Sequence, residues 1–200
     1  AITPSVAAST YTVAEDAFSS VGGGTIPVDL VAAPGDTTDM RNSFIHLQDA
    51  FDEFEERFGP YRWERVGYCL TPQGAMEHPC NISYPTYIVD GGLLYEATMA
   101  HELAHMWFGD LITCATAEEM YINEGFAEYL SYLFLERVYG TDRYMDEVRS
   151  NHHDMLHTAH VTDEGWYALA DMPQDFTYGA HTYNKGADVL HTLRNYLGEN

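Results

Sequence analysis

Two histidines in the segment HELAH, His101 and His105, stand four residues apart, with Glu102 directly after the first. On an α-helix, residues four apart project from the same face, so both imidazoles can bind one metal ion. Glu102 lies about 100° around such a helix from His101, which places it near the ion but turned away from direct binding. This is the position expected of a base that takes a proton from an attacking water, and it indicates metal-assisted hydrolysis.

A third ligand is needed to separate this segment from chance, because the five-residue pattern arises by accident in a chain of this composition at roughly 4%. A catalytic zinc site has three protein ligands and one open position. Glu124 lies on the next predicted helix, and two helices joined by a short loop pack antiparallel, so its carboxylate can reach the same ion. The segment HDMLH at 153–157 repeats the histidine spacing but has Phe176 in place of a third ligand, and we expect it to be the polar face of a surface helix.

Four segments of the chain together resemble the motifs of one family. HELAHMWFGD at 101–110 is followed by NEGFAEY at 123–129, GAMEHPCNISYP precedes both at 74–85, and TYNKGADVL follows at 182–190. In this order they resemble the zinc aminopeptidases of the aminopeptidase N and leukotriene hydrolase family, which are gluzincin metallopeptidases. The resemblance covers roughly residues 60 to 195. It implies an α+β, thermolysin-like catalytic domain with a small sheet followed by a helical lobe.

The resemblance also implies a role for each residue of the site. One zinc ion is held by His101, His105 and Glu124, and Glu102 is the general base that later passes its proton to the leaving amine. Attack on a peptide carbonyl leaves an oxyanion, to which the Tyr183 hydroxyl is placed by resemblance to donate a hydrogen bond. These roles predict a zinc-dependent aminopeptidase.

The segment GAMEH predicts that residues are removed from the N-terminus of a peptide. In the family, the glutamate of the Gly-x-Met-Glu motif pairs with the free α-ammonium of the substrate, and Glu77 stands at that position. The backbone of Gly74, Ala75 and Met76 can bind substrate as an added strand. His78 departs from the family's usual asparagine, and because histidine titrates near neutrality it could alter the pH profile.

Three further polar residues have two interpretations each. Glu128, one helical turn after Glu124, could accept the second ring proton of a ligand histidine and fix its orientation, or it could be a solvated acid of a helix. Asp110 has the same two interpretations. Tyr178 could line the substrate cleft, although packing in the core or on the surface is the more common role of a tyrosine.

The order of the predicted elements is strands first and helices second, which is typical of α+β proteins. Thr116 and Glu119 form a capping-box pattern ahead of one helix. We expect strands over residues 25–32, 64–71 and 80–89, and helices over 41–59, 93–108, 120–140, 142–158 and 184–198.

The domain organisation follows from the polar, glycine-rich start of the chain. We expect residues 1–25 to be a lead-in or the end of a preceding β domain, and 26–200 to be a gluzincin catalytic domain that is incomplete at its C-terminal end. Family members carry a β domain before this one and a helical domain after it. The resemblance therefore implies flanking domains of the same chain as partners, beside peptide substrates with a free N-terminus.

Composition narrows the possible partners. The net charge of −22, from 9 basic and 31 acidic residues, argues against nucleic acid and anionic membrane surfaces. The sequence contains no run of about 18 apolar residues, so it predicts no membrane-spanning helix. Cys69 and Cys80 flank a turn and could form a disulfide or remain free thiols, and Cys114 has no evident partner. Acidity and few cysteines favour an extracellular or periplasmic location.

Other functions remain open from the sequence. A zinc endopeptidase is disfavoured by GAMEH, and a non-catalytic zinc-binding module is disfavoured because all the residues that the chemistry needs are present. No motif singles out an epoxide-hydrolysing enzyme of the leukotriene branch.

Overall fold

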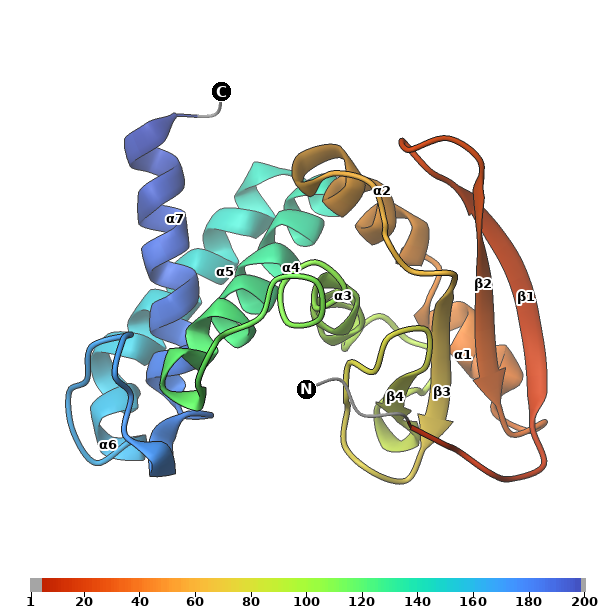
Figure 1. Cartoon of the computed structure of the whole chain (residues 1–200), viewed down its shortest axis with the longest axis horizontal. Helices are drawn as coiled ribbons and strands as arrows, with labels where there is room; N and C mark the ends of the chain where they lie inside the picture. Colours follow the sequence, from red (N-terminus) through yellow and green to blue (C-terminus); the bar gives the residue numbers. More distant parts are fainter. Residues whose placement is uncertain (1–4, 199–200) are drawn as a thin grey trace.

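The structure, a computed structural model, describes residues 5–198 as an α+β fold (Figure 1). Four strands form one sheet in the order β1-β2-β3-β4. The first pair is antiparallel and the other two pairs are parallel. The strands are β1 (Thr12–Ser19), β2 (Thr25–Ala32), β3 (Val66–Thr71) and β4 (Ile82–Pro85).

The sequence predicts a lead-in or the end of a preceding β domain over residues 1–25, without placing a strand there. Residues 12–19 instead pair along their whole length with β2. Gly23 and Gly24 lie in the connecting turn with φ of 90° and 85°, a conformation that glycine adopts without strain. β1 is an edge strand with only Ala14 and Phe18 buried, so it does not show the apolar alternation by which a strand is usually predicted.

The helix predicted over residues 41–59 is two helices, α1 (Thr37–Ser43) and α2 (Leu47–Phe58). The predicted apolar face is present in the break and along α2, since Phe44, Leu47, Phe51 and Phe54 are all buried. Phe58 lies at the rim of the core, with its ring 5.4 Å from that of Phe108.

The strand predicted over 80–89 ends at Pro85, and a 3₁₀ turn, Thr86–Ile88, follows. The expected capping box is also wrong. Thr116 makes no side-chain cap, and a 3₁₀ helix, Ala117–Ile122, stands where the helix was expected to begin.

The helical lobe follows the sheet in the chain. α3 (Glu96–Ala104) and α4 (Glu124–Tyr139) lie between the sheet and the pair α5 (Thr141–Asp154) and α7 (Gly186–Leu197) (Figure 1). Two π-helical segments interrupt the α-helices, Met155–Ala159 after α5 and His181–Lys185 before α7. The remaining elements are α6 (His160–Thr162) and the 3₁₀ turn Gln174–Phe176.

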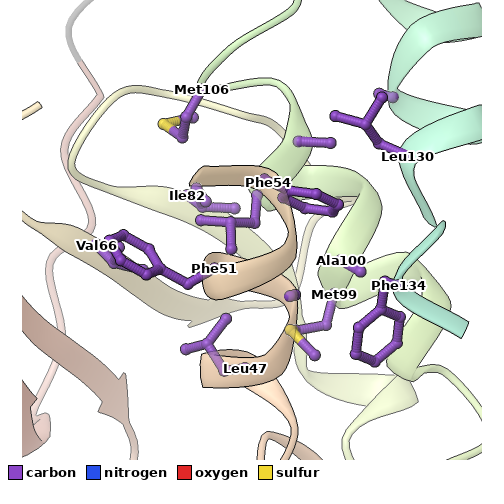
Figure 2. Close-up of a cluster of buried hydrophobic side chains, with 14 of the residues drawn as sticks. Leu47, Phe51, Phe54, Val66, Ile82, Met99, Ala100, Met106, Leu130 and Phe134 are labelled. Carbon is purple, nitrogen blue, oxygen red and sulfur yellow. The ribbon is translucent and has the colours of Figure 1, made fainter. Parts of the chain in front are cut away.

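One hydrophobic core joins the sheet to the helices. Figure 2 shows residues of α2 enclosed by residues from β3, β4, α3 and α4. Burial of aliphatic and aromatic side chains stabilises such a core by roughly 1.5–3 kcal/mol each, so the core fixes α3 and α4 against one another. The labelled residues are Leu47, Phe51, Phe54, Val66, Ile82, Met99, Ala100, Met106, Leu130 and Phe134.

Two further expectations concern the cysteines and the membrane. Cys69, Cys80 and Cys114 are all free thiols, so the disulfide between Cys69 and Cys80 does not form. Within residues 5–198, no helix has both the length and the apolar character that crossing a bilayer requires.

Candidate metal centre

His101, His105 and Glu124 come together where α3 meets the first residue of α4. The two Nε2 atoms lie 3.1 Å apart, and Glu124 Oε2 is 3.3 Å from each. Tetrahedral coordination with metal–ligand distances near 2.0–2.1 Å places ligand atoms about 3.3 Å from one another. The three side chains therefore have the spacing that one zinc ion requires.

Each histidine ring is oriented through its other nitrogen. His101 Nδ1 lies 3.2 Å from Glu128 Oε2, and the Tyr132 hydroxyl donates to Glu128 Oε1 at 2.9 Å. His105 Nδ1 lies 2.9 Å from the backbone oxygen of Phe108 and donates to it. Both rings consequently direct Nε2 toward the metal position, which is the usual arrangement for histidine ligands.

The orientation of His105 depends on a tight turn after α3. Gly109 has a φ of 135°, and a Cβ there would lie 2.8 Å from His105 Nδ1. The motif HELAHMWFG therefore needs its glycine for space as well as for backbone conformation. Sequence reasoning missed the Phe108 carbonyl because the backbone of every residue carries one, so residue type gives no signal. Tyr132 could have been found, since it stands one helical turn after Glu128.

Glu102 lies on α3 between the ligands and is buried. Its Oε2 atom is buried and has no hydrogen-bond partner among the described residues. Burial raises the pKa of Glu102 to about 7, and Glu77 and Glu124 add to this shift against the opposing effect of the two histidines. A carboxyl group with a pKa near neutrality can both accept and return a proton at neutral pH.

When no cation is bound, the two ligand histidines hold protons tightly and the ligand Glu124 stays ionised. Burial alone would lower the pKa of His101, but hydrogen bonds with Glu124 and Glu128 outweigh it and raise the pKa to about 10. Burial would likewise raise the pKa of Glu124, yet its hydrogen bonds with the two histidines lower the pKa to about 2. The site is therefore arranged for positive charge, carried by protons or by a metal ion.

A cavity of about 430 Å³ opens over this centre and is lined by the three ligands, Glu102 and Tyr183. Ala75, Met76 and Glu77 also line this cavity. Met76 pairs with Ser83 of β4 through two backbone hydrogen bonds of 3.0 and 2.9 Å. The amide of His78 also donates to the backbone oxygen of Met76 at 3.0 Å, so the chain turns at Glu77.

Tyr183 lies on the π-helix that precedes α7, and its ring stacks on that of His101 with centroids 6.1 Å apart. Burial and the nearby Glu124 raise the pKa of Tyr183, so the hydroxyl remains a hydrogen-bond donor. The backbones of α4 and α7 meet closely here: a Cβ on Gly125 would lie 2.9 Å from Gly186 Cα. This contact holds the Tyr183 segment directly beside Glu124.

Three predicted or considered residues, Asp110, His78 and Gly74, lie outside this arrangement. Asp110 makes no contact with a ligand ring and lines a neighbouring cavity of about 490 Å³ together with His78. Burial and the charge of Glu77 raise the pKa of Asp110 to about 7. Gly74 is exposed and does not line either cavity, whereas Tyr178 lines both. Both histidines of HDMLH are exposed, as expected for a surface helix.

The sequence matches the Peptidase family M1 domain over residues 43–200. The chain belongs to this family of metallopeptidases. It is similar to aminopeptidase M1-B of Oryza sativa, with 31% identity over 74% of this chain and 19% of that protein. It is also similar to a leucyl aminopeptidase of Saccharolobus solfataricus, with 28% identity over 88% of this chain and 25% of that protein. The chain thus spans about a fifth to a quarter of the length of these relatives.

Solved structures agree with the fold. The M1 zinc metallopeptidase of Deinococcus radiodurans superimposes with a TM-score of 0.73 at 25% identity, over 94% of this chain and 41% of that one. Aminopeptidase A of Legionella pneumophila gives a TM-score of 0.75 at 20% identity, over 94% of this chain and 23% of that one. The ligand set and the family together assign one zinc ion as the cofactor.

Proposed function

We propose that this chain is the catalytic part of a zinc aminopeptidase that removes residues from the N-terminus of peptides. The observation that carries this proposal is that Glu77 and the ligand triad line the same cavity. A carboxylate in the same cavity as the metal position can pair with a free α-ammonium group, and it thereby selects the first peptide bond of a chain. A substrate without that ammonium group would leave Glu77 unpaired.

The chain's own residues divide the work among them. Glu77 binds the ammonium group, and the backbone at Ala75, which lines the cavity, aligns the substrate as an added strand. Glu102 accepts a proton from the attacking water and returns it to the leaving amine. Tyr183 donates a hydrogen bond to the oxyanion that forms from the substrate carbonyl. A bound zinc ion supplies Lewis acidity, which polarises that carbonyl and lowers the pKa of water.

Free-amine and N-acetylated substrates distinguish an aminopeptidase from an endopeptidase. The zinc-loaded chain should hydrolyse leucyl-p-nitroanilide and should be nearly inactive on N-acetyl-leucyl-p-nitroanilide. Glu77→Gln should reduce kcat/KM for the free amine and leave the residual rate on the acetylated substrate unchanged. Equal rates on the two substrates would instead identify an endopeptidase.

A scaffold that binds zinc without catalysis is tested by Glu102→Gln. This substitution retains the three ligands and removes the proton acceptor, so zinc should still bind while kcat falls about 10²- to 10⁴-fold. Zinc content measured by atomic absorption is the control. Full activity of Glu102→Gln at normal zinc content would remove Glu102 from the mechanism.

We also propose an extracellular or periplasmic location and flanking domains in the same chain. The net charge of −22 supports the first, and the partial coverage of the relatives supports the second. Fractionation of the source cells, followed by immunoblotting for size and compartment, tests both. A band of about 22 kDa confined to the cytoplasm would contradict them.

A further inference from the structure

A buried hydrogen-bonded pair lies outside the metal centre, at the start of the segment that carries Tyr183. His181 is completely buried, Asp163 is 1% exposed, and His181 Nδ1 lies 2.6 Å from Asp163 Oδ2. Asp163 stands in the chain turn after α6, so the pair joins two segments that are distant in sequence. A carboxylate is rarely buried to this extent unless its oxygens are bonded, and both oxygens of Asp163 have partners.

Asp163 also binds the backbone at the N-terminus of the π-helix His181–Lys185. Oδ1 accepts the amide of Ala180 at 3.0 Å, and Oδ2 accepts the amide of His181 at 2.8 Å. The first backbone amides of a helix have no acceptor within the helix, and a carboxylate is a favoured cap for them. A Cβ on Gly179 would lie 2.6 Å from Asp163 Oδ1, so only glycine leaves room for the carboxylate.

The rest of this segment is fixed on its other sides. Trp166 and Tyr167 pack their rings against His181, with centroids 5.8 and 5.6 Å away. Asn184 donates to Asn151 on α5 at 2.7 Å. Together with the contact between the two glycines of α4 and α7, these interactions surround Tyr183 but leave its ring facing His101 and the cavity.

We propose that Asp163 and His181 are positioning residues that fix the Tyr183 hydroxyl for catalysis, an inference that rests on the proposed aminopeptidase function. Neither side chain lines the cavity over the metal centre, so both would act through the backbone of the π-helix. Preorganised donors are effective because they do not have to reorganise when charge develops on the substrate. A displacement of about 1 Å in a catalytic group can cost about 10²-fold in rate.

Three substitutions test the pair in the full zinc-loaded chain. Asp163→Asn removes the charge of the carboxylate. His181→Leu removes the side-chain donor but keeps an apolar side chain in the buried position. His181→Asn keeps a donor near the position of Nδ1 and should restore most of the activity. The first two should lower kcat about 10- to 100-fold with KM changed less than about twofold. His181→Leu and His181→Asn remain informative if Asp163→Asn fails to fold.

Glu55→Gln is a matched control far from Tyr183. Glu55 is 2% exposed and accepts the amides of Val21 and Tyr61, each at 2.7 Å, in the same manner as Asp163 accepts its two amides. This variant should lower the melting temperature without changing kcat. A loss of kcat in Glu55→Gln as large as in His181→Leu would mean that destabilisation alone explains both, and would overturn the proposal.

A double-mutant cycle with Tyr183→Phe separates positioning from general support. If the pair acts through the Tyr183 hydroxyl, adding His181→Leu to Tyr183→Phe should change kcat less than about twofold. If His181→Leu instead lowers kcat by the same factor with and without Tyr183→Phe, the two effects are independent and the proposal is overturned. A KM effect without a kcat effect would also overturn it.

Hydrogen exchange gives a readout that does not need turnover. Amides of residues 180–185 should exchange at least about tenfold faster in His181→Leu, and they should be unchanged in His181→Asn and Glu55→Gln. Unchanged exchange in His181→Leu would overturn the proposal, whatever the activity. A parent chain that is inactive on every free-amine substrate would defeat the proposed function, and exchange would still decide whether the pair holds this segment.

Discussion

Glu102 should destabilise the metal-free protein at the same time as it serves catalysis. Its pKa of about 7, against an ordinary value of 4.5, means that ionising this carboxylate is harder in the folded chain than in the unfolded chain. The difference corresponds to about 3 kcal/mol, since one pKa unit is worth about 1.4 kcal/mol. Replacing Glu102 by glutamine removes this ionisation and should make folding less dependent on pH.

The sign follows from proton binding. Between pH 4.5 and pH 7 the folded chain holds the Glu102 proton more tightly than the unfolded chain, so stability falls as the pH rises through this range and stays lower above it. Going from pH 5 to pH 8, the free energy of unfolding of Glu102→Gln should therefore rise by about 2.5 kcal/mol relative to the parent. Any constant cost of burying the amide cancels, because it is the same at both pH values.

Urea unfolding in EDTA at the two pH values measures this difference, with tryptophan fluorescence as the signal. Glu128→Gln is a control of opposite sign, because hydrogen bonds with His101 and Tyr132 outweigh burial and lower the pKa of Glu128. Its stability relative to the parent should be nearly the same at pH 5 and pH 8 and should recover only below about pH 4.5, because a lowered pKa acts below the ordinary value. Adding zinc should reduce the gain from Glu102→Gln, since a cation stabilises the carboxylate. A Glu102→Gln difference that is the same at pH 5 and pH 8 would refute this reasoning.

Three other outcomes follow from the same geometry. Glu128→Gln should weaken zinc binding about 10- to 100-fold, measured by competition with a chelator, and an unchanged affinity would contradict the role of Glu128 in orienting His101. Zinc affinity should rise with pH, and zinc binding should release protons, because the pKa of His101 is raised to about 10. Calorimetry in buffers of different ionisation enthalpy measures the protons released, and finding none would contradict this prediction. Gly125→Ala should cost about 1–3 kcal/mol of stability, because its Cβ would lie 2.9 Å from backbone at Gly186; an unchanged melting temperature would contradict that close contact.

The ligand triad could be predicted from sequence because it depends on local periodicity. His101 and His105 share one face of a single helix, and Glu124 needed only one further assumption, that the next helix packs beside it. The core face of α2 was predictable for the same reason, although the break before it was not. A chain can leave and resume helical conformation while its apolar spacing continues, as it does after Ser43.

The parts that could not be predicted depend on contacts between distant residues. β1 is recognisable only by its pairing with β2, since most of its side chains face solvent. Asp163 and His181 stand in no motif, and their interaction exists only because the turn after α6 returns to the start of the π-helix. Periodicity within a short window carries no information on such contacts.

The charges around the cavity explain why these distant supports are needed. Glu77, Glu102, Glu124 and Glu128 all line one cavity with only two histidines, and they repel one another at short range. Repulsion of this kind favours any displacement that separates the carboxylates, so helix packing must hold α3 and α4 in place. The glycine contact at Gly125 and the buried pair that holds the Tyr183 segment oppose this displacement from outside the site. Several carboxylates are therefore buried around a single position. Their burial gives the site its affinity for a cation, and it also requires rigid packing of the helices around the site.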